Sequence, residues 1–158
     1  MLIVGMLLLV ALSITLIVFL HEAHTEFPDR ITVEADGVTE KILNVRDLKL
    51  MPTEKKEYSV SFFCAASGRY SFDVEYVEKK DGGLKDHVIV DVLLDDKAVY
   101  SGPLSELLDE DVTINFEGTL EDEVPLTVSF IYEMPRHVGN EAQGTWSDFD
   151  IKFAVKKS

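Results

Sequence analysis

The strongest constraint on this chain is an alternation of apolar and polar residues that recurs from residue 31 to the C-terminus. Successive side chains of a β-strand point to opposite faces of a sheet, so a period of two is typical of strands with one buried face. The clearest apolar rows are Tyr58, Val60, Phe62 and Cys64, followed by Tyr70, Phe72, Val74 and Tyr76. We expect Cys64 to be a core residue of its strand.

Turn signals separate these runs, for example Asp36-Gly37 and Ser67-Gly68. Residues 46–55 are predicted as a loop and Lys79–Gly83 as a solvated hairpin loop. The one helical-looking stretch of the domain is Pro103–Leu108. About eight or nine strands with turns every 8–12 residues, and no helices of βαβ length, predict an all-β fold: an antiparallel two-sheet sandwich over residues 30–158.

Residues 1–20 carry no charged side chain. A helix of that length spans about 30 Å, the thickness of a bilayer's hydrocarbon core. We therefore favour an uncleaved transmembrane anchor, with residues 21–29 as a juxtamembrane linker. A cleaved signal sequence is the main alternative, although no Lys or Arg precedes the apolar run and His21–His24 makes a poor cleavage site. A buried core helix is the third.

The two readings predict different locations. An anchor with acidic residues after it places the N-terminus inside and the domain outside the cell membrane. A cleaved sequence would give a secreted, extracellular domain.

The net charge is −14, and all of it falls outside the uncharged first twenty residues. Such an acidic domain repels phosphate backbones, so nucleic acid is not an expected partner. Cys64 is the single cysteine, so it has no partner for a disulfide within the chain. An exported domain of this kind must therefore be stabilised by its hydrophobic core.

Candidate chemical motifs are weak. His21 and His24 have a spacing of three, whereas a zinc-binding helix places two His four apart. Acidic clusters such as Asp109–Asp111 could offer oxygens to calcium, but none matches a twelve-residue calcium loop. His87 and His137 belong to no recognisable triad, and no nucleophile elbow occurs. We predict no catalytic, cofactor-binding or metal-binding residues.

Three stretches, in order, resemble the TasA/camelysin family of exported bacterial proteins. Leu50-Met51-Pro52 precedes the Tyr58 strand, Asp95–Leu107 contains a Tyr-x-Gly-x-Leu pattern, and Gly139–Gly144 precedes the last aromatic strand. The residues that carry the resemblance are Pro52, Tyr100, Gly102, Leu104, Pro135, Asn140, Gln143 and Gly144.

The resemblance implies a jelly-roll domain in a biofilm matrix or surface fibre, whose subunits join by donating a strand. It therefore implies a non-enzymatic structural or adhesive protein that associates with itself or with related subunits. A camelysin-type cell-surface metallopeptidase is the alternative, and a pilin-like filament subunit is a second one.

The residues themselves suggest where association would occur. Edge strands of a sandwich carry unpaired backbone groups that can accept a strand from a neighbour. The run from Arg30 to Val45 follows the linker and could reach outward. We hypothesise that this run, or the edge beside it, mediates assembly.

Overall fold

The computed structural model describes residues 30–109 and 112–158. The predicted anchor at residues 1–20 and the linker at 21–29 lie outside the described residues. Among the helices within the described ranges, none is long and apolar enough to cross a membrane.

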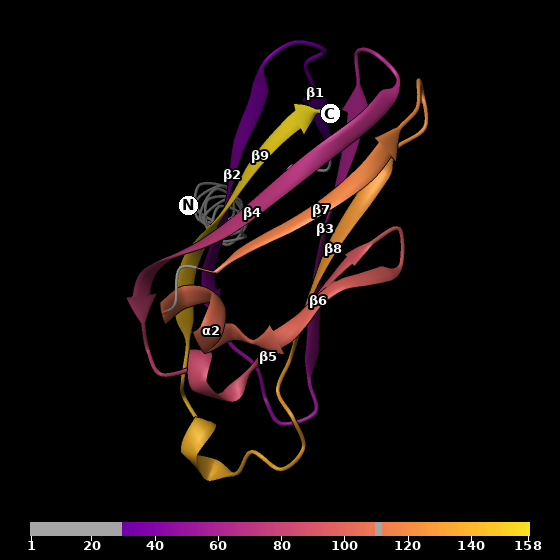
Figure 1. Cartoon of the computed structure of the whole chain (residues 1–158). Helices are drawn as coiled ribbons and strands as arrows, with labels where there is room; N and C mark the ends of the chain where they lie inside the picture. The colour runs from indigo at the N-terminus through magenta and orange to yellow at the C-terminus, as the bar shows by residue number, and fades with distance from the viewer. Residues whose placement is uncertain (1–29, 110–111) are drawn as a thin grey trace, which may run out of the picture.

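The described residues form two sheets that pack face to face as an all-β sandwich (Figure 1). One sheet has the order β1-β3-β8-β5-β6 and the other β2-β9-β4-β7. The strands are β1 (Arg30–Val33), β2 (Val38–Leu48), β3 (Lys55–Cys64), β4 (Gly68–Asp81), β5 (Ile89–Leu94), β6 (Lys97–Pro103), β7 (Thr113–Leu120), β8 (Leu126–Glu133) and β9 (Ser147–Lys157). The pairs are antiparallel except β1 with β3, which is parallel.

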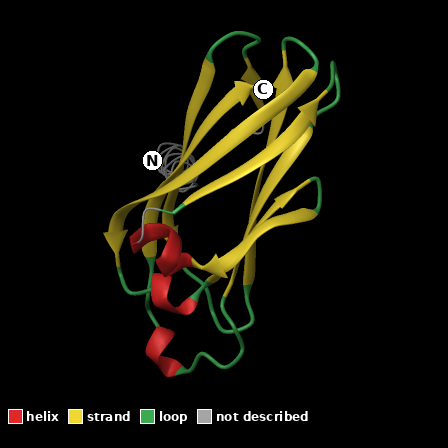
Figure 2. Cartoon of the chain, viewed as in Figure 1, coloured by secondary structure: helices red, strands yellow, loops and turns green. Residues whose placement is uncertain are grey.

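Three short helices gather at one end of the sandwich (Figure 2). They are the 3-10 helices η1 (Lys85–His87) and η2 (Asn140–Ala142) and the α-helix α2 (Leu104–Asp109). Helix α2 confirms the predicted helical stretch at Pro103–Leu108. It buries Leu104, Leu107 and Leu108, which places its apolar face over the open end of the core.

Aromatic rings from both sheets form the centre of the core. Phe62 of β3 lies 5.2 Å from Phe72 and 5.1 Å from Phe153, measured between ring centroids, and these two belong to the opposite sheet. Phe130 of β8 is 5.7 Å from Phe153 in an edge-to-face arrangement. Edge-to-face and offset geometries suit the ring quadrupoles, so these contacts add to the burial of apolar area.

Two loop predictions are wrong. Lys79–Gly83 is not a hairpin loop, because β4 continues to Asp81 by pairing with β9, and the chain then crosses through η1 into the other sheet. The predicted loop at 46–55 is also shorter. Strand β2 continues to Leu48, whose side chain is buried, and Arg46 is held by a 2.7 Å ion pair with Asp150 of β9. Long-range pairing thus overrides the local polarity of both segments.

Tyr76 and Tyr132 join the two sheets through a hydrogen bond of 3.0 Å between their hydroxyl oxygens. Both side chains are buried, at 2% and 0% exposure. Burial raises the pKa of both hydroxyls above their ordinary value of 10.0, because an unsolvated phenolate is unfavourable.

We expect stability to fall above about pH 10, because the unfolded chain loses these two protons while the folded chain keeps them. Each tyrosine contributes up to about 1.4 kcal/mol per pH unit to that decline. Urea titrations of the wild type and of Tyr76→Phe/Tyr132→Phe at several alkaline pH values measure it. The double variant should show a shallower decline, and equal slopes would contradict the assignment.

Candidate functional site

The geometry singles out β1 and the edge it occupies. β1 has four residues and, among the described strands, pairs only with β3. Its register places Ile31 opposite Phe62 and Val33 opposite Cys64. A short parallel strand with one neighbour is held by few backbone hydrogen bonds, so we expect β1 to be released more readily than the longer strands.

The side chains of β1 nevertheless complete the core. Ile31 is 2% exposed and Val33 0%, so both fill space between the sheets. On the outer face, the Arg30 guanidinium lies 3.9 Å from the centroid of the Phe63 ring, a cation–π contact. Full burial of one such aliphatic side chain contributes about 1.5–3 kcal/mol. Removing β1 would therefore leave an apolar groove that favours its refilling by an equivalent strand.

The turn after β1 carries the chain from one sheet to the other. Gly37 has a φ of 87°, a conformation that favours glycine, and the Glu34 backbone N–H donates to Thr39 Oγ1 at 2.9 Å. β1 otherwise pairs with β3, and just after β3 the Ala65 N–H donates to the Val33 carbonyl. This turn is consequently the point about which β1 could swing without disturbing β2.

The edge of β3 extends beyond β1. β1 pairs with residues 61–64 of β3, and its register does not extend to residues 55–60. Val60 is buried there and Tyr58 is half-buried, with its ring 5.8 Å from that of Tyr132. This stretch has the backbone groups and the apolar inner row that an added strand requires.

The residues of the family resemblance lie elsewhere, in two groups. Tyr100, Gly102 and Leu104 form the junction of β6 and α2. A Cβ atom at Gly102 would overlap the Tyr100 hydroxyl, which donates to Glu106 at 3.4 Å, and the Leu104 N–H donates to the Val88 carbonyl at 2.9 Å. This group shapes the entry into the helix.

Asn140, Gln143 and Gly144 belong to the long loop between β8 and β9. The Gln143 side-chain amide donates to Asn140 Oδ1 at 3.3 Å, and Gly144 has a φ of 74°. Met134, just before Pro135, exchanges backbone hydrogen bonds with Thr53 and Glu54, just after Pro52. The two proline loops therefore lie side by side, with a surface groove of about 350 Å³ between residues 49–56 and 144–145.

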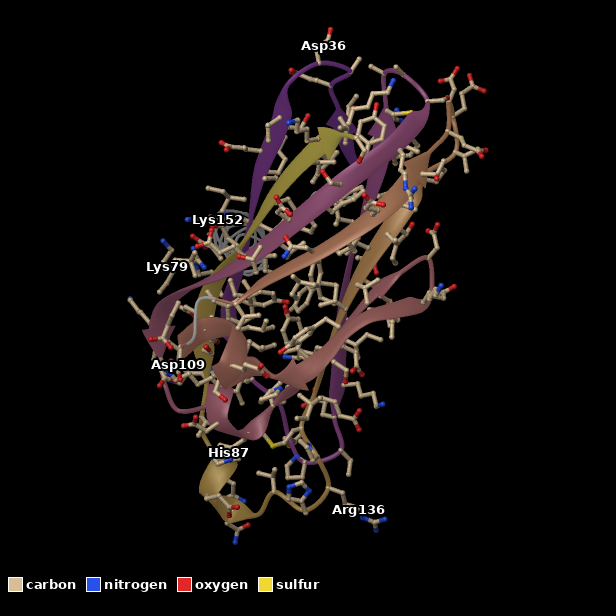
Figure 3. The ribbon with its side chains drawn as sticks, in the orientation of Figure 1. Asp36, Lys79, His87, Asp109, Arg136 and Lys152 are labelled. Atoms are coloured by element: carbon tan, nitrogen blue, oxygen red, sulfur yellow. The ribbon has the colours of Figure 1, made fainter. Side chains whose placement is uncertain are left out.

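This loop group is at the opposite end of the sandwich from the β1–β2 turn. Figure 3 shows Asp36 at one end and Arg136 at the other. Strand β3 runs between them, about 30 Å from Lys55 to Cys64. The structure thus brings Pro52 together with the Pro135–Gly144 loop, but it does not bring that group to the edge strand predicted to mediate assembly.

One cluster of three carboxylates surrounds a lysine within the fold. Lys85 Nζ lies 2.6 Å from Asp109, 2.7 Å from Glu78 and 3.7 Å from Asp81, and its side chain is only 13% exposed. The hydrogen bonds that this ammonium donates to Asp109 and Glu78 raise its pKa above 10.5. Within the described residues, no group of three or more His, Cys, Asp or Glu side chains is arranged to hold a metal ion.

Replacing Lys85 with Met should lower the free energy of unfolding by about 1.5–3 kcal/mol at neutral pH, the usual contribution of hydrogen bonds to a charged group. Three carboxylates would then face one another at the junction of β4, η1 and α2. Added salt should reduce the loss, and the contribution should begin to decline above pH 10.5 and be lost only as the pH passes the raised pKa of the folded state. Thermal and urea unfolding measure both effects.

Lys97→Met is the matched control, because Lys97 lies exposed after the turn between β5 and β6. It should change stability little. Equal losses from the two substitutions would show that the cluster around Lys85 contributes nothing specific.

Other candidate residues have ordinary roles. Cys64 is partly buried and packs against the core, which agrees with its predicted place on the inner face of β3. The pKa of Glu141 is lowered by hydrogen bonds from its own and the Gly139 backbone N–H, with smaller effects from His87 and His137. His21 and His24 lie outside the described residues. The edge of β3 at residues 55–60 had no signal in the sequence, because only the pairing of β1 defines it.

No family model matches the sequence, and no curated protein matches it. Eleven chains of solved structures are similar, and two of them illustrate the likeness. The C-terminal domain of EclA, a sugar-binding protein, has a TM-score of 0.40 and 16% identity, with 75% of this chain and 79% of that domain covered. PliG of Aeromonas hydrophila, a periplasmic inhibitor of g-type lysozyme, has a TM-score of 0.35 and 10% identity, with 81% and 98% covered. Likenesses this distant carry no argument about ligand or activity.

Proposed function

We propose that this chain is a non-enzymatic structural protein of the cell surface, TasA-like, that builds or anchors extracellular fibres by donating a strand to a second copy. β1 is the donor and the edge of β3 is the acceptor. Attachment to the membrane through residues 1–20, or release after cleavage, belongs to the same proposal and rests on the sequence.

The observation that carries the proposal is that β1 is additional to the eight strands that make up two four-stranded sheets. The remaining strands form two four-stranded halves, β2-β9-β4-β7 and β3-β8-β5-β6. Eight strands in two such sheets are what a jelly roll requires, and we infer this topology for the domain. β1 is a ninth strand that fills a groove beside β3 without being needed to connect the other eight.

Strand exchange is chemically favourable for such an element. The Ile31 and Val33 side chains meet the same environment whether β1 belongs to the same copy or to another. The balance between the two states therefore depends on concentration and on strain in the Glu34–Gly37 turn rather than on new contacts. A longer incoming strand would also run along residues 55–60 of β3, which lie beyond the register of β1.

Val33→Cys tests this directly, because Val33 and the native Cys64 are register partners on the inner faces of adjacent strands. Adjacent strands lie about 4.8 Å apart, within the Cα range that a disulfide accepts. We expect oxidation of the assembled full-length protein to give a ladder of covalent multimers on non-reducing gels. Oxidation of dilute monomer should instead close the bond within one chain and block later assembly.

Val33→Cys/Cys64→Ser controls for disulfides formed by other routes and should give no ladder. Assemblies whose disulfides are all within single chains would rule out donation of β1. Deleting residues 30–36 offers a second test by electron microscopy, and fibres that persist unchanged after that deletion would rule it out as well. If the wild type forms no assemblies at any concentration, the fibre function itself fails.

A further inference from the structure

β2 is the second long edge on the same side of the sandwich, and it offers its own site for strand addition. It has eleven residues and, among the described strands, β9 as its single neighbour. An edge of this length presents alternate N–H and C=O groups to solvent. Its outer face also exposes Val38 and Ile42, at 51% and 55%. By length and apolar character, β2 should pair with another chain more readily than β3 does.

One residue in the inner row of β2 is exposed, although the other residues of the row are buried. Thr39, Leu43 and Val45 are buried, yet Lys41 in the same row is exposed. The residues opposite this row on β9 are all at most 1% exposed; they are Val155, Phe153, Ile151 and Phe149. No carboxylate of the described residues forms an ion pair with Lys41. Lys41 is thus an exposed cation, without an ion-pair partner among the described residues, in a row whose other members are buried.

Lys41 also lies near the middle of the regular part of β2. The register with β9 shifts between Val45 and Leu48, where Asp47 has a φ of 51°. This irregularity bends the strand and disturbs pairing at that end. The regular stretch is therefore 38–45. A strand added there would lie against Lys41 and would remove water from its ammonium group, which is unfavourable for an ion without a partner.

We propose that Lys41 is a specificity-determining residue that closes the β2 edge to a second copy of this chain. An inward-pointing charge on an edge strand acts by this mechanism, since it leaves the fold intact and penalises only the wrong partner. Lys41 thereby disfavours strand addition to the sheet that contains β2. The inference does not depend on donation by β1, because it concerns the other sheet.

Full-length Lys41→Val, kept in the same mild detergent as the wild type, tests the proposal. Valine suits a buried strand position and removes the charge. We expect the dimer dissociation constant, measured by light scattering on a sizing column over a range of concentrations, to fall about tenfold or more. Lys41→Glu retains a charge at the same position and should associate no more than the wild type.

Two further measurements make the result decisive. Circular dichroism and thermal unfolding verify that each variant folds. If the valine variant does not fold, Lys41→Thr replaces it, because threonine already occupies position 39 of the same row. Locking β1 with the disulfide between Val33→Cys and Cys64 should leave the added association of Lys41→Val intact. Loss of that association in the locked variant would assign it to β1 exchange, and the absence of added association in both folded variants would overturn the proposal.

Discussion

The aromatic seam between the two sheets is the interaction on which the rest of this structure depends. Phe62 and Phe130 from one sheet meet Phe72 and Phe153 from the other at centroid separations between 5.1 and 5.7 Å. A sheet of this kind buries only one face, so each half of the sandwich is stable only because the other half covers it. The Tyr76–Tyr132 hydrogen bond fixes how the two halves align, because neither hydroxyl can reach water.

A sandwich that is closed in this way still has edges, and the edges differ in how they are protected. β1 lies over one end of the β3 edge, and Lys41 places a charge in the inner row of β2. At the other end of the molecule, α2 and the loops around η1 and η2 close the core (Figure 2). The side of the sandwich that carries β1, β2 and β3 is therefore where association would be decided, whereas the helical end serves to complete the fold.

Much of the sandwich could be predicted because burial of one strand face leaves a local signature. The alternating rows at Tyr58–Cys64 and Tyr70–Tyr76 gave correct strands, and the turn at Asp36-Gly37 was correctly placed. The errors came where pairing partners distant in sequence decide the outcome. Lys80 and Asp81 read as loop residues, but they pair with Asp148 and Ser147 of β9 and so belong to β4. No local pattern carries that information.

The sequence by itself determined the all-β character and the position of the α-helix Leu104–Asp109, because both depend on side-chain periodicity and turn residues that are local. The tertiary structure decided the parallel pairing of β1, the extension of β3 beyond the register of β1 and the exceptional position of Lys41. Lys41 shows the reason: in the sequence it is one polar residue among several. It becomes significant only when Phe153 is found opposite it and β9 is the single neighbour of β2 among the described strands, a relation that the folded chain alone creates.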